Sequence, residues 1–176
     1  GATALNGTFN YAGGSISGNT SLVLTAGDVM NMTGTTKEIW GATLQNGGTV
    51  NLSLASGNDL QLSNGGTFTN TGTVNFNDNN AIAPRSGFGP GTFSNAGGTL
   101  AVAAGKTGAV TVESTTFSGN STLNTSAAGS QLTLAPTTTA SYSGTLTALG
   151  SGVSFANGGA QHNFANGLVL NGTFTQ

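Results

Sequence analysis

Carboxylates are the side chains of this chain that could cleave a glycan, and they are few. The sequence contains five of them: Asp28, Glu38, Asp59, Asp78 and Glu113. Glycoside hydrolysis requires two carboxyl groups that flank the scissile bond, or a metal that such groups hold. The sequence does not predict such a pair on one face. We therefore expect that the chain is not an enzyme, and a pectate-lyase-like activity is the weaker alternative.

Three of these acids could instead form a calcium site. Asp28, Asp59 and Asp78 are expected to precede the third strand in three successive copies of a repeat, with Lys106 at the matching turn of the next copy. Clustered carboxylate and carbonyl oxygens are the ligands that Ca²⁺ prefers. Aspartate also suits turns for structural reasons alone, and these turns lack a dense ligand motif. The structural role is favoured, so no cofactor is expected, with calcium as the alternative.

Two longer connections carry most of the other chemically distinctive side chains. They span residues 33–41 and 83–91 and contain Lys37, Glu38, Trp40, Arg85 and Phe88. Both are expected to follow the third strand and to project from the same corner, two coils apart. Aromatic side chains on loops often anchor binding. A glycan- or partner-binding patch is one interpretation, and insertions whose rings cover an apolar edge are the other.

Other polar residues give weaker signals. His162 is the single histidine and the chain has no cysteine, so we expect His162 in a turn and not in a metal site. Thr-x-Thr pairs occur at 67/69, 71/73, 145/147 and 173/175. A flat threonine array could order water, but these pairs do not all align from copy to copy. Ice binding is therefore the least favoured of the alternative functions.

The composition excludes several classes of protein. Of 176 residues, 36% are hydrophobic and 5% are charged, with a formal net charge of -2. The three basic residues are dispersed, so nucleic acid is not an expected partner. No apolar run approaches the roughly 20 residues of a membrane-spanning helix. The exterior must consist mainly of Thr, Ser, Asn and Gly, and we expect a soluble segment cut from something longer.

A repeat dominates the sequence. Its motif is an aromatic residue or Leu, an Asn two residues later, and then Gly-Thr-apolar, as in Phe68–Val74. The leading position recurs at intervals of 24, 25, 24, 25 and 22 residues, at Leu44, Phe68, Phe93, Phe117, Tyr142 and Phe164. A second apolar column is expected at Ile16, Val50, Val74, Leu100, Leu123 and Leu170. A third includes the segments 29–32, 60–62 and 132–134. Each copy thus supplies three short strands.

The alternation within these segments is typical of strands with one buried and one solvated face. Turns are expected at Asn46–Gly48, Asn64–Gly66 and 157–159. The sequence therefore predicts an all-β, right-handed parallel β-helix with about seven coils of ~24 residues and three strands per coil. We expect residues 1–176 to form a single solenoid domain.

Stacked coils should place like residues above one another. The leading column becomes an aromatic ladder, and the expected asparagine ladder comprises Asn46, Asn70, Asn95 and Asn166. These asparagines are expected at a sharp left-handed bend, where they could also hydrogen-bond from coil to coil. Gly119 and Gly144 replace them in two coils.

The two ends of the chain resemble each other. Leu5–Phe9 and Leu170–Phe174 share the sequence Leu-Asn-Gly-Thr-Phe, with an offset of 165 residues that is close to seven periods. No polar cap is evident at either end, although solenoids normally carry caps. We expect a segment of a longer repeat array or a subunit that stacks end to end.

The repeats at 66–74, 91–100 and 117–120 resemble the β-helical regions of bacterial autotransporter passengers and filamentous haemagglutinin-like adhesins. The resemblance covers nearly the whole chain and implies export, display on the cell surface, adhesion or matrix building. The expected partners are neighbouring repeats, other copies of the chain, and host or matrix glycans. The resemblance supplies no active-site residues.

Overall fold

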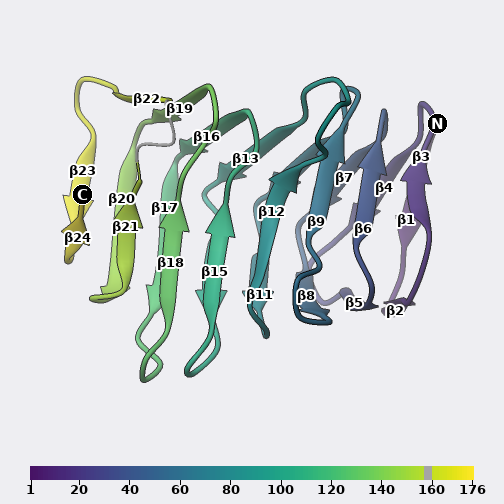
Figure 1. Cartoon of the computed structure of the whole chain (residues 1–176), viewed down its shortest axis with the longest axis horizontal. Helices are drawn as coiled ribbons and strands as arrows, with labels where there is room; N and C mark the ends of the chain where they lie inside the picture. The colour runs from purple at the N-terminus through teal and green to yellow at the C-terminus, as the bar shows by residue number, and fades with distance from the viewer. Residues whose placement is uncertain (157–159) are drawn as a thin grey trace.

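The computed structural model describes residues 1–156 and 160–176, so the turn predicted at 157–159 lies outside the described residues. The described residues form 24 strands in three sheets. No helix among them is long and apolar enough to cross a membrane. The predicted all-β parallel solenoid of about seven coils with three strands per coil is confirmed. The coils stack along the long axis of the molecule, with the two termini at opposite ends (Figure 1).

Each coil contributes one strand to each sheet. Sheet A consists of β1 (Ala2–Leu5), β4 (Ser21–Leu24), β7 (Thr43–Asn46), β10 (Thr67–Asn70), β13 (Thr92–Ala96), β16 (Ser114–Ser118), β19 (Thr139–Tyr142) and β22 (Gln161–Phe164). Sheet B consists of β2 (Thr8–Tyr11), β5 (Val29–Gly34), β8 (Thr49–Leu54), β11 (Thr73–Phe76), β14 (Thr99–Val102), β17 (Asn120–Thr125), β20 (Thr145–Gly150) and β23 (Val169–Asn171). Sheet C consists of β3 (Ser15–Ser17), β6 (Lys37–Trp40), β9 (Leu60–Ser63), β12 (Asn80–Pro84), β15 (Thr107–Val110), β18 (Gln131–Leu134), β21 (Val153–Phe155) and β24 (Phe174–Thr175).

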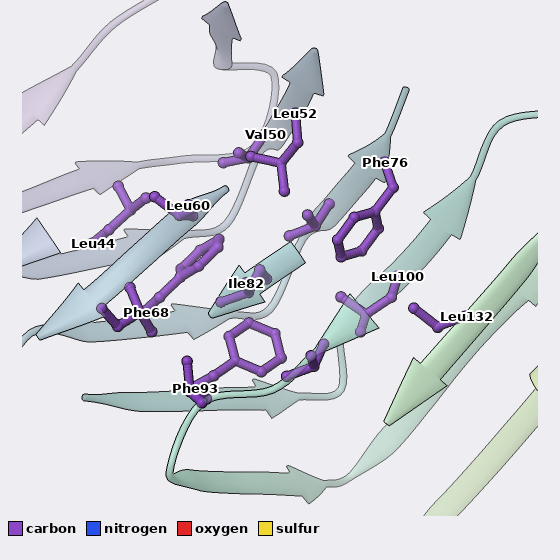
Figure 2. Packing of buried hydrophobic residues seen from close by; sticks show 14 of the residues in the cluster. Leu44, Val50, Leu52, Leu60, Phe68, Phe76, Ile82, Phe93, Leu100 and Leu132 are labelled. Carbon is purple, nitrogen blue, oxygen red and sulfur yellow. The ribbon is translucent and has the colours of Figure 1, made fainter. Parts of the chain in front are cut away.

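Alternating side chains explain how the three sheets enclose one core. In β8 and β10 every second residue is buried, and the residues between them are partly exposed. The buried positions of successive coils lie above one another, as Figure 2 shows for Leu44, Phe68 and Phe93 and for Leu52 and Phe76. Burying one such side chain contributes about 1.5–3 kcal/mol, so stability accumulates coil by coil along a continuous core.

The glycine of the repeat motif is required by close stacking at the corner between sheets A and B. A Cβ atom at Gly72 would overlap the carbonyl oxygen of Gly48. A Cβ atom at Gly48 would in turn overlap the carbonyl oxygen of Asp28. Glycine therefore precedes Thr49, Thr73 and Thr99 because the backbones of successive coils approach too closely there for a side chain.

The expected strand columns are wrong in the first coils. Ile16 lies in β3 of sheet C, where it pairs with Ile39, and is not in the second column. Residues 29–32 lie in β5 of sheet B and not in the third column. The reason is coil length: Met30 pairs with Phe9 and Val50, at offsets of only 21 and 20 residues. A fixed period of 24 therefore displaces these segments by one strand.

The likeness of the two ends does not extend to their positions in the fold. Leu5 ends β1 of sheet A and Phe9 lies in β2 of sheet B. Leu170 lies in β23 of sheet B and Phe174 in β24 of sheet C. The shared five residues thus turn different corners of the solenoid.

Candidate functional site

The first of the two expected loops is a strand. Residues 37–40 form β6, so the side chains alternate between the core and the solvent. Lys37 faces inward and is fully buried, and its Nζ donates to the carbonyl oxygen of Thr35 at 2.6 Å. Its ammonium lies 5.6 Å from the centre of the Tyr11 ring. Burial lowers the pKa of Lys37, and the residue does not belong to an exposed patch.

The other four residues of the predicted patch meet on the outer surface of sheet C. Glu38 and Trp40 extend from β6, and Arg85 and Phe88 belong to the connection after β12. Arg85 Nη1 lies 2.8 and 2.7 Å from the two carboxylate oxygens of Glu38. The Arg85 guanidinium carbon lies 4.0 Å from the centre of the Phe88 ring, and the Trp40 and Phe88 rings contact edge to face at 4.8 Å. We call these four residues the strap cluster.

The strap cluster fastens the connection at 85–91 across two coils. Asn64 and Gly65 donate backbone hydrogen bonds to the carbonyl oxygens of Gly89 and Pro90, at 2.7 and 2.8 Å. Ser63 Oγ donates to Glu38 at 2.6 Å. Burial opposes the ionisation of Glu38, but the hydrogen bonds from Arg85 and Ser63 and the charge of Arg85 outweigh it and lower the pKa of Glu38. Glu38 is therefore a structural anion.

The three aspartates of the predicted calcium site do not share a corner. Asp28 lies between β4 and β5, at the corner of sheets A and B. Asp59 and Asp78 lie before β9 and β12, at the corner of sheets B and C. The prediction for Asp28 is wrong because residues 29–32 belong to sheet B. Among the described residues, no group of three or more His, Cys, Asp and Glu could hold a metal ion.

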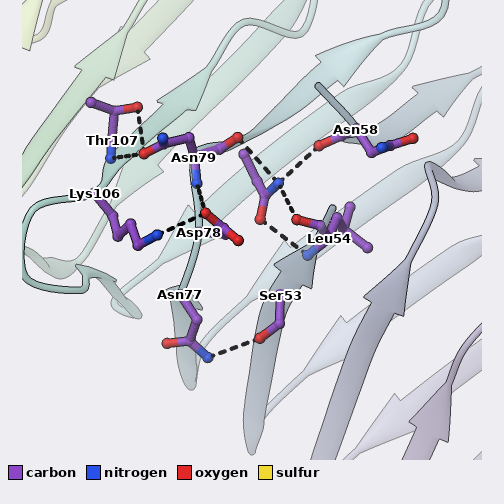
Figure 3. A network of polar contacts seen from close by, with 9 residues as sticks. Ser53, Leu54, Asn58, Asn77, Asp78, Asn79, Lys106 and Thr107 are labelled. Carbon is purple, nitrogen blue, oxygen red and sulfur yellow. Dashed lines mark hydrogen bonds and ion pairs between the residues drawn. The ribbon is translucent and has the colours of Figure 1, made fainter. Parts of the chain in front are cut away.

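Each of these aspartates accepts hydrogen bonds from neighbouring groups. Asp28 accepts from the backbone N–H groups of Gly7 and Thr25 at 2.7 Å, and its pKa is lowered by the Thr25 hydroxyl and by these two N–H groups. Asp59 Oδ1 accepts from the N–H of Ala81 at 2.8 Å. Asp78 accepts from Lys106 Nζ at 3.0 Å (Figure 3). The hydrogen bond from Lys106 is the largest cause of the lowered pKa of Asp78.

The asparagine ladder exists inside sheet A, with three of its four predicted members. Asn46 Nδ2 donates to Asn70 Oδ1 at 2.7 Å, and Asn70 Nδ2 donates to Asn95 Oδ1 at 2.6 Å. Asn95 Nδ2 donates to the carbonyl oxygen of Gly98 at 2.8 Å, which ends the ladder. All three residues are buried. Asn166 is exposed and lies beyond β22, outside this ladder.

The ladder asparagines do not adopt the predicted left-handed geometry. Among the described non-glycine residues, only Asn64 has a positive φ, of 50°. Gly119 and Gly144 have φ values of 66° and 79°, so the bend does require glycine in those coils. The asparagines are held by hydrogen bonds between coils and not by a requirement of the backbone.

The aromatic ladder is continuous in space but shifts along the strands. Phe68 pairs with Phe93, whereas Phe93 pairs with Thr115 and Asn95 pairs with Phe117. The rings of Phe93 and Phe117 still meet, at 6.2 Å between centroids. Tyr142 and Phe164 continue the column at the position that asparagine occupies in the earlier coils. Equal spacing of the aromatic residues in sequence does not reveal this shift of two residues.

His162 lies in β22 and not in a turn. Its Nδ1 is 2.9 Å from the hydroxyl of Tyr142, and its Nε2 is 3.1 Å from the carbonyl oxygen of Ala156. The imidazole also stacks on the Tyr142 ring at 5.8 Å. Both ring nitrogens are thus engaged within the protein, and the histidine has a packing role.

A second asparagine ladder, which sequence reasoning missed, lies on the outer face of sheet B. Asn31, Asn51 and Asn75 each donate to the asparagine of the preceding coil, beginning with Asn10, at 2.8–2.9 Å. The residue in register beside Asn75 in the next coil is Ala101, where this ladder stops. The sequence pattern does indicate this ladder, because each of the four asparagines lies two residues after the first residue of its strand, in β2, β5, β8 and β11.

The outer face of sheet A carries hydroxyl groups in two columns, which we call the hydroxyl array. The first column contains Thr67, Thr92, Ser114 and Thr139, which are aligned in register. The second column contains Thr69, Ser94, Thr116 and Ser141, which are aligned in the same way. All eight side chains are partly or fully exposed. The Thr-x-Thr pattern does not reveal the whole array because serine replaces threonine at three of the eight positions.

Charge is distributed unevenly around the solenoid. No Asp, Glu, Lys or Arg occurs in any described strand of sheets A and B. Glu38 and Lys37 lie in sheet C, and five of the other six charged residues lie at its two corners: Asp59, Asp78, Arg85, Lys106 and Glu113. Two sides of the molecule are therefore uncharged and one side carries almost all the charge.

Comparisons with protein-family models, with curated proteins and with solved structures found no match. The resemblance to adhesin repeats therefore rests on the repeat motifs of the sequence and on the solenoid fold.

Proposed function

We propose that the chain is a structural and adhesive module of an extracellular bacterial surface or matrix protein. It is similar in kind to the β-helical regions of autotransporter passengers and filamentous haemagglutinin-like adhesins. The observation that carries the proposal is the in-register pairing of eight strands in each sheet around one core. Such a stack is stiff along its axis, which suits a spacer that holds other surfaces apart or together.

The state of the five carboxylates favours this function over catalysis. Asp28, Asp59 and Glu113 accept backbone N–H groups, and Glu38 and Asp78 pair with a basic side chain. Glycoside cleavage needs a pair of carboxyl groups that are free to act as acid and as base or nucleophile. These carboxylates instead stabilise the corners between sheets and the strap cluster, as expected of a structural module.

The outer faces of sheets A and B provide the adhesive surface in this proposal. They are uncharged, and their regular rows of hydroxyl and amide groups suit lateral contact with a second copy of the chain. Contacts between uncharged faces should resist salt. At 1 M ionic strength the Debye length is only about 3 Å, so salt weakens mainly long-range interactions between charges, and these faces do not rely on such interactions.

Clustering of beads coated with the chain tests the proposal. We expect clustering that persists in 1 M salt, and Thr73→Lys with Thr99→Lys on sheet B should reduce it through repulsion between like charges. Gln131→Lys on exposed sheet C is the matched control and should leave clustering unchanged. Dispersed beads, together with cleavage of a polysaccharide that Glu38→Gln abolishes, would overturn the proposal in favour of an enzyme.

A second candidate function, carbohydrate binding, is favoured by the strap cluster. Trp40 and Phe88 contact each other beside Arg85, and Phe88 is 44% exposed. Aromatic faces beside a polar group suit the stacking of sugar rings. A glycan array probed with the chain and with Phe88→Ala tests this function. Equal signals from the two proteins would exclude it.

A further inference from the structure

We propose that the hydroxyl array on the outer face of sheet A binds the surface of ice. The array is a two-dimensional lattice because its two columns are fixed by strand geometry. Along the solenoid axis the hydroxyls repeat once per coil, at about 4.8 Å. Along each strand the two hydroxyls are two residues apart, at about 6.7 Å. These spacings are comparable with the oxygen repeats on a prism face of hexagonal ice.

The hydroxyls of the array are free to bond to water. Of the eight array hydroxyls, only that of Thr67 has a hydrogen bond to another described residue, a contact of 3.3 Å to the carbonyl oxygen of Gly65. Each hydroxyl supplies one donor and two acceptor sites. The outer asparagine amides of sheet B differ, because they donate to one another from coil to coil. Sheet A therefore offers its hydrogen-bonding capacity to an external lattice, and sheet B uses much of its own internally.

The surroundings of the array also suit ice. A charged side chain retains a tight hydration shell that does not fit the ice lattice, and the strands of sheet A contain no Asp, Glu, Lys or Arg. The threonine methyl groups add apolar contacts between the hydroxyls. The in-register backbone already holds the side chains in place, so little conformational entropy is lost when they bind a rigid surface.

Partition of the chain into slowly grown ice tests the proposal, with the fluorescence of the single Trp40 as the measure of concentration. We expect several-fold enrichment relative to a protein of similar size that ice excludes. Thr92→Lys and Thr116→Lys at the centre of the array should abolish the enrichment. Gln131→Lys on sheet C and Thr73→Lys on sheet B are matched controls that should retain it.

Two further variants keep the test independent of folding. Thr92→Val with Thr116→Val keeps the β-branched shape and removes two hydroxyls, so enrichment should fall while the circular dichroism melting curve is retained. Ser94→Thr with Ser114→Thr extends the threonine columns, leaves only Ser141 as serine, and should raise enrichment. Exclusion of the unmodified chain from ice, or equal enrichment of the chain and all Lys variants, would overturn the proposal.

Discussion

Two neighbouring pairs of strands in sheet A fill the same interior in different ways. In the coils of β10 and β13 the inner face holds Phe68 or Phe93, followed two residues later by a ladder asparagine. In the coils of β16 and β19 the same positions hold a small residue, Thr115 or Ala140, followed by Phe117 or Tyr142. We call the first pair the amide coils and the second pair the aromatic coils.

The comparison shows that the total side-chain volume inside each coil stays similar, although the residue types at the two positions change. When the ring moves two residues along the strand, the position that it leaves is filled by a smaller side chain. The amide coils then depend on directed hydrogen bonds between buried polar groups, which are costly when broken. The aromatic coils depend on the packing of rings, such as Phe117 on Tyr142 at 5.4 Å and 13° between planes. The amide coils and the aromatic coils should therefore respond differently to substitution.

The largest effect is expected for Phe117→Ala in the aromatic coils. Phe117 is 1% exposed and its ring joins those of Phe93 and Tyr142. Loss of such a ring leaves a cavity and should lower the free energy of unfolding by about 3–5 kcal/mol. Urea unfolding followed by circular dichroism measures the change. Phe88→Ala on the surface is the control, and a similar loss for both would contradict the central role of the column.

The second effect is expected for Asn70→Ala in the amide coils. The substitution leaves Asn46 Nδ2 without its ladder acceptor and Asn95 Oδ1 without its donor. Unpaired buried groups cost about 1–3 kcal/mol each, so we expect a loss of about 2–3 kcal/mol in the same assay. Asn51→Ala in the outer ladder is the matched control, because water can replace its partners. Its loss should be about 0.5 kcal/mol or less.

A smaller effect tests the exchange of volume directly. Asn70→Phe alone should overpack the amide coils, and Phe68→Ala alone should leave a cavity. The double variant reproduces the arrangement of Ala140 and Tyr142. We expect the double variant to be more stable than the sum of the single losses implies, by about 1 kcal/mol or more. Strictly additive losses would mean that the two positions do not share one volume.

The smallest effect concerns pH. The carboxylates whose pKa is lowered, Asp28, Glu38 and Asp78, all precede the aromatic coils in sequence. A lowered folded-state pKa contributes stability above the unfolded value, about 4.3 for Glu, and this contribution is lost as pH falls through the folded value. Amide hydrogen exchange at pH 7 and near pH 3, corrected for intrinsic rates, should show protection lost mainly in residues 1–90.

Glu38→Gln isolates one part of this pH effect. At pH 7 it should cost about 1 kcal/mol, because it weakens a partly exposed ion pair with Arg85. Near pH 3 the cost should be smaller, because protonation of Glu38 increasingly removes the same charge from the unmodified chain as the pH falls. An equal cost at both pH values would show that the charge of Glu38 does not matter.

Sequence patterns predicted the architecture well because they depend on which side chains face inward. Alternation in segments such as 60–62 and 132–134 identified short strands, and the recurring Phe and Asn positions identified coils. The patterns also drew attention to Glu38, Trp40, Arg85 and Phe88, which do meet in the strap cluster. They misplaced Lys37, because a loop was expected where β6 continues sheet C.

The inward or outward face of each side chain and, outside the first coils, the period of the repeat were thus determined by the sequence. The register between strands and the contacts between side chains were decided by the tertiary structure. A one-residue slip between strands would turn the apolar residues outward, and the pattern excludes it. A two-residue slip leaves every side chain on its own face, so the pattern allows Phe117 to pair either with Phe93 or with Asn95. Packing of ring and amide volumes between neighbouring coils selects Asn95 as its partner. The same register aligns threonine with serine across sheet A and so creates the hydroxyl array.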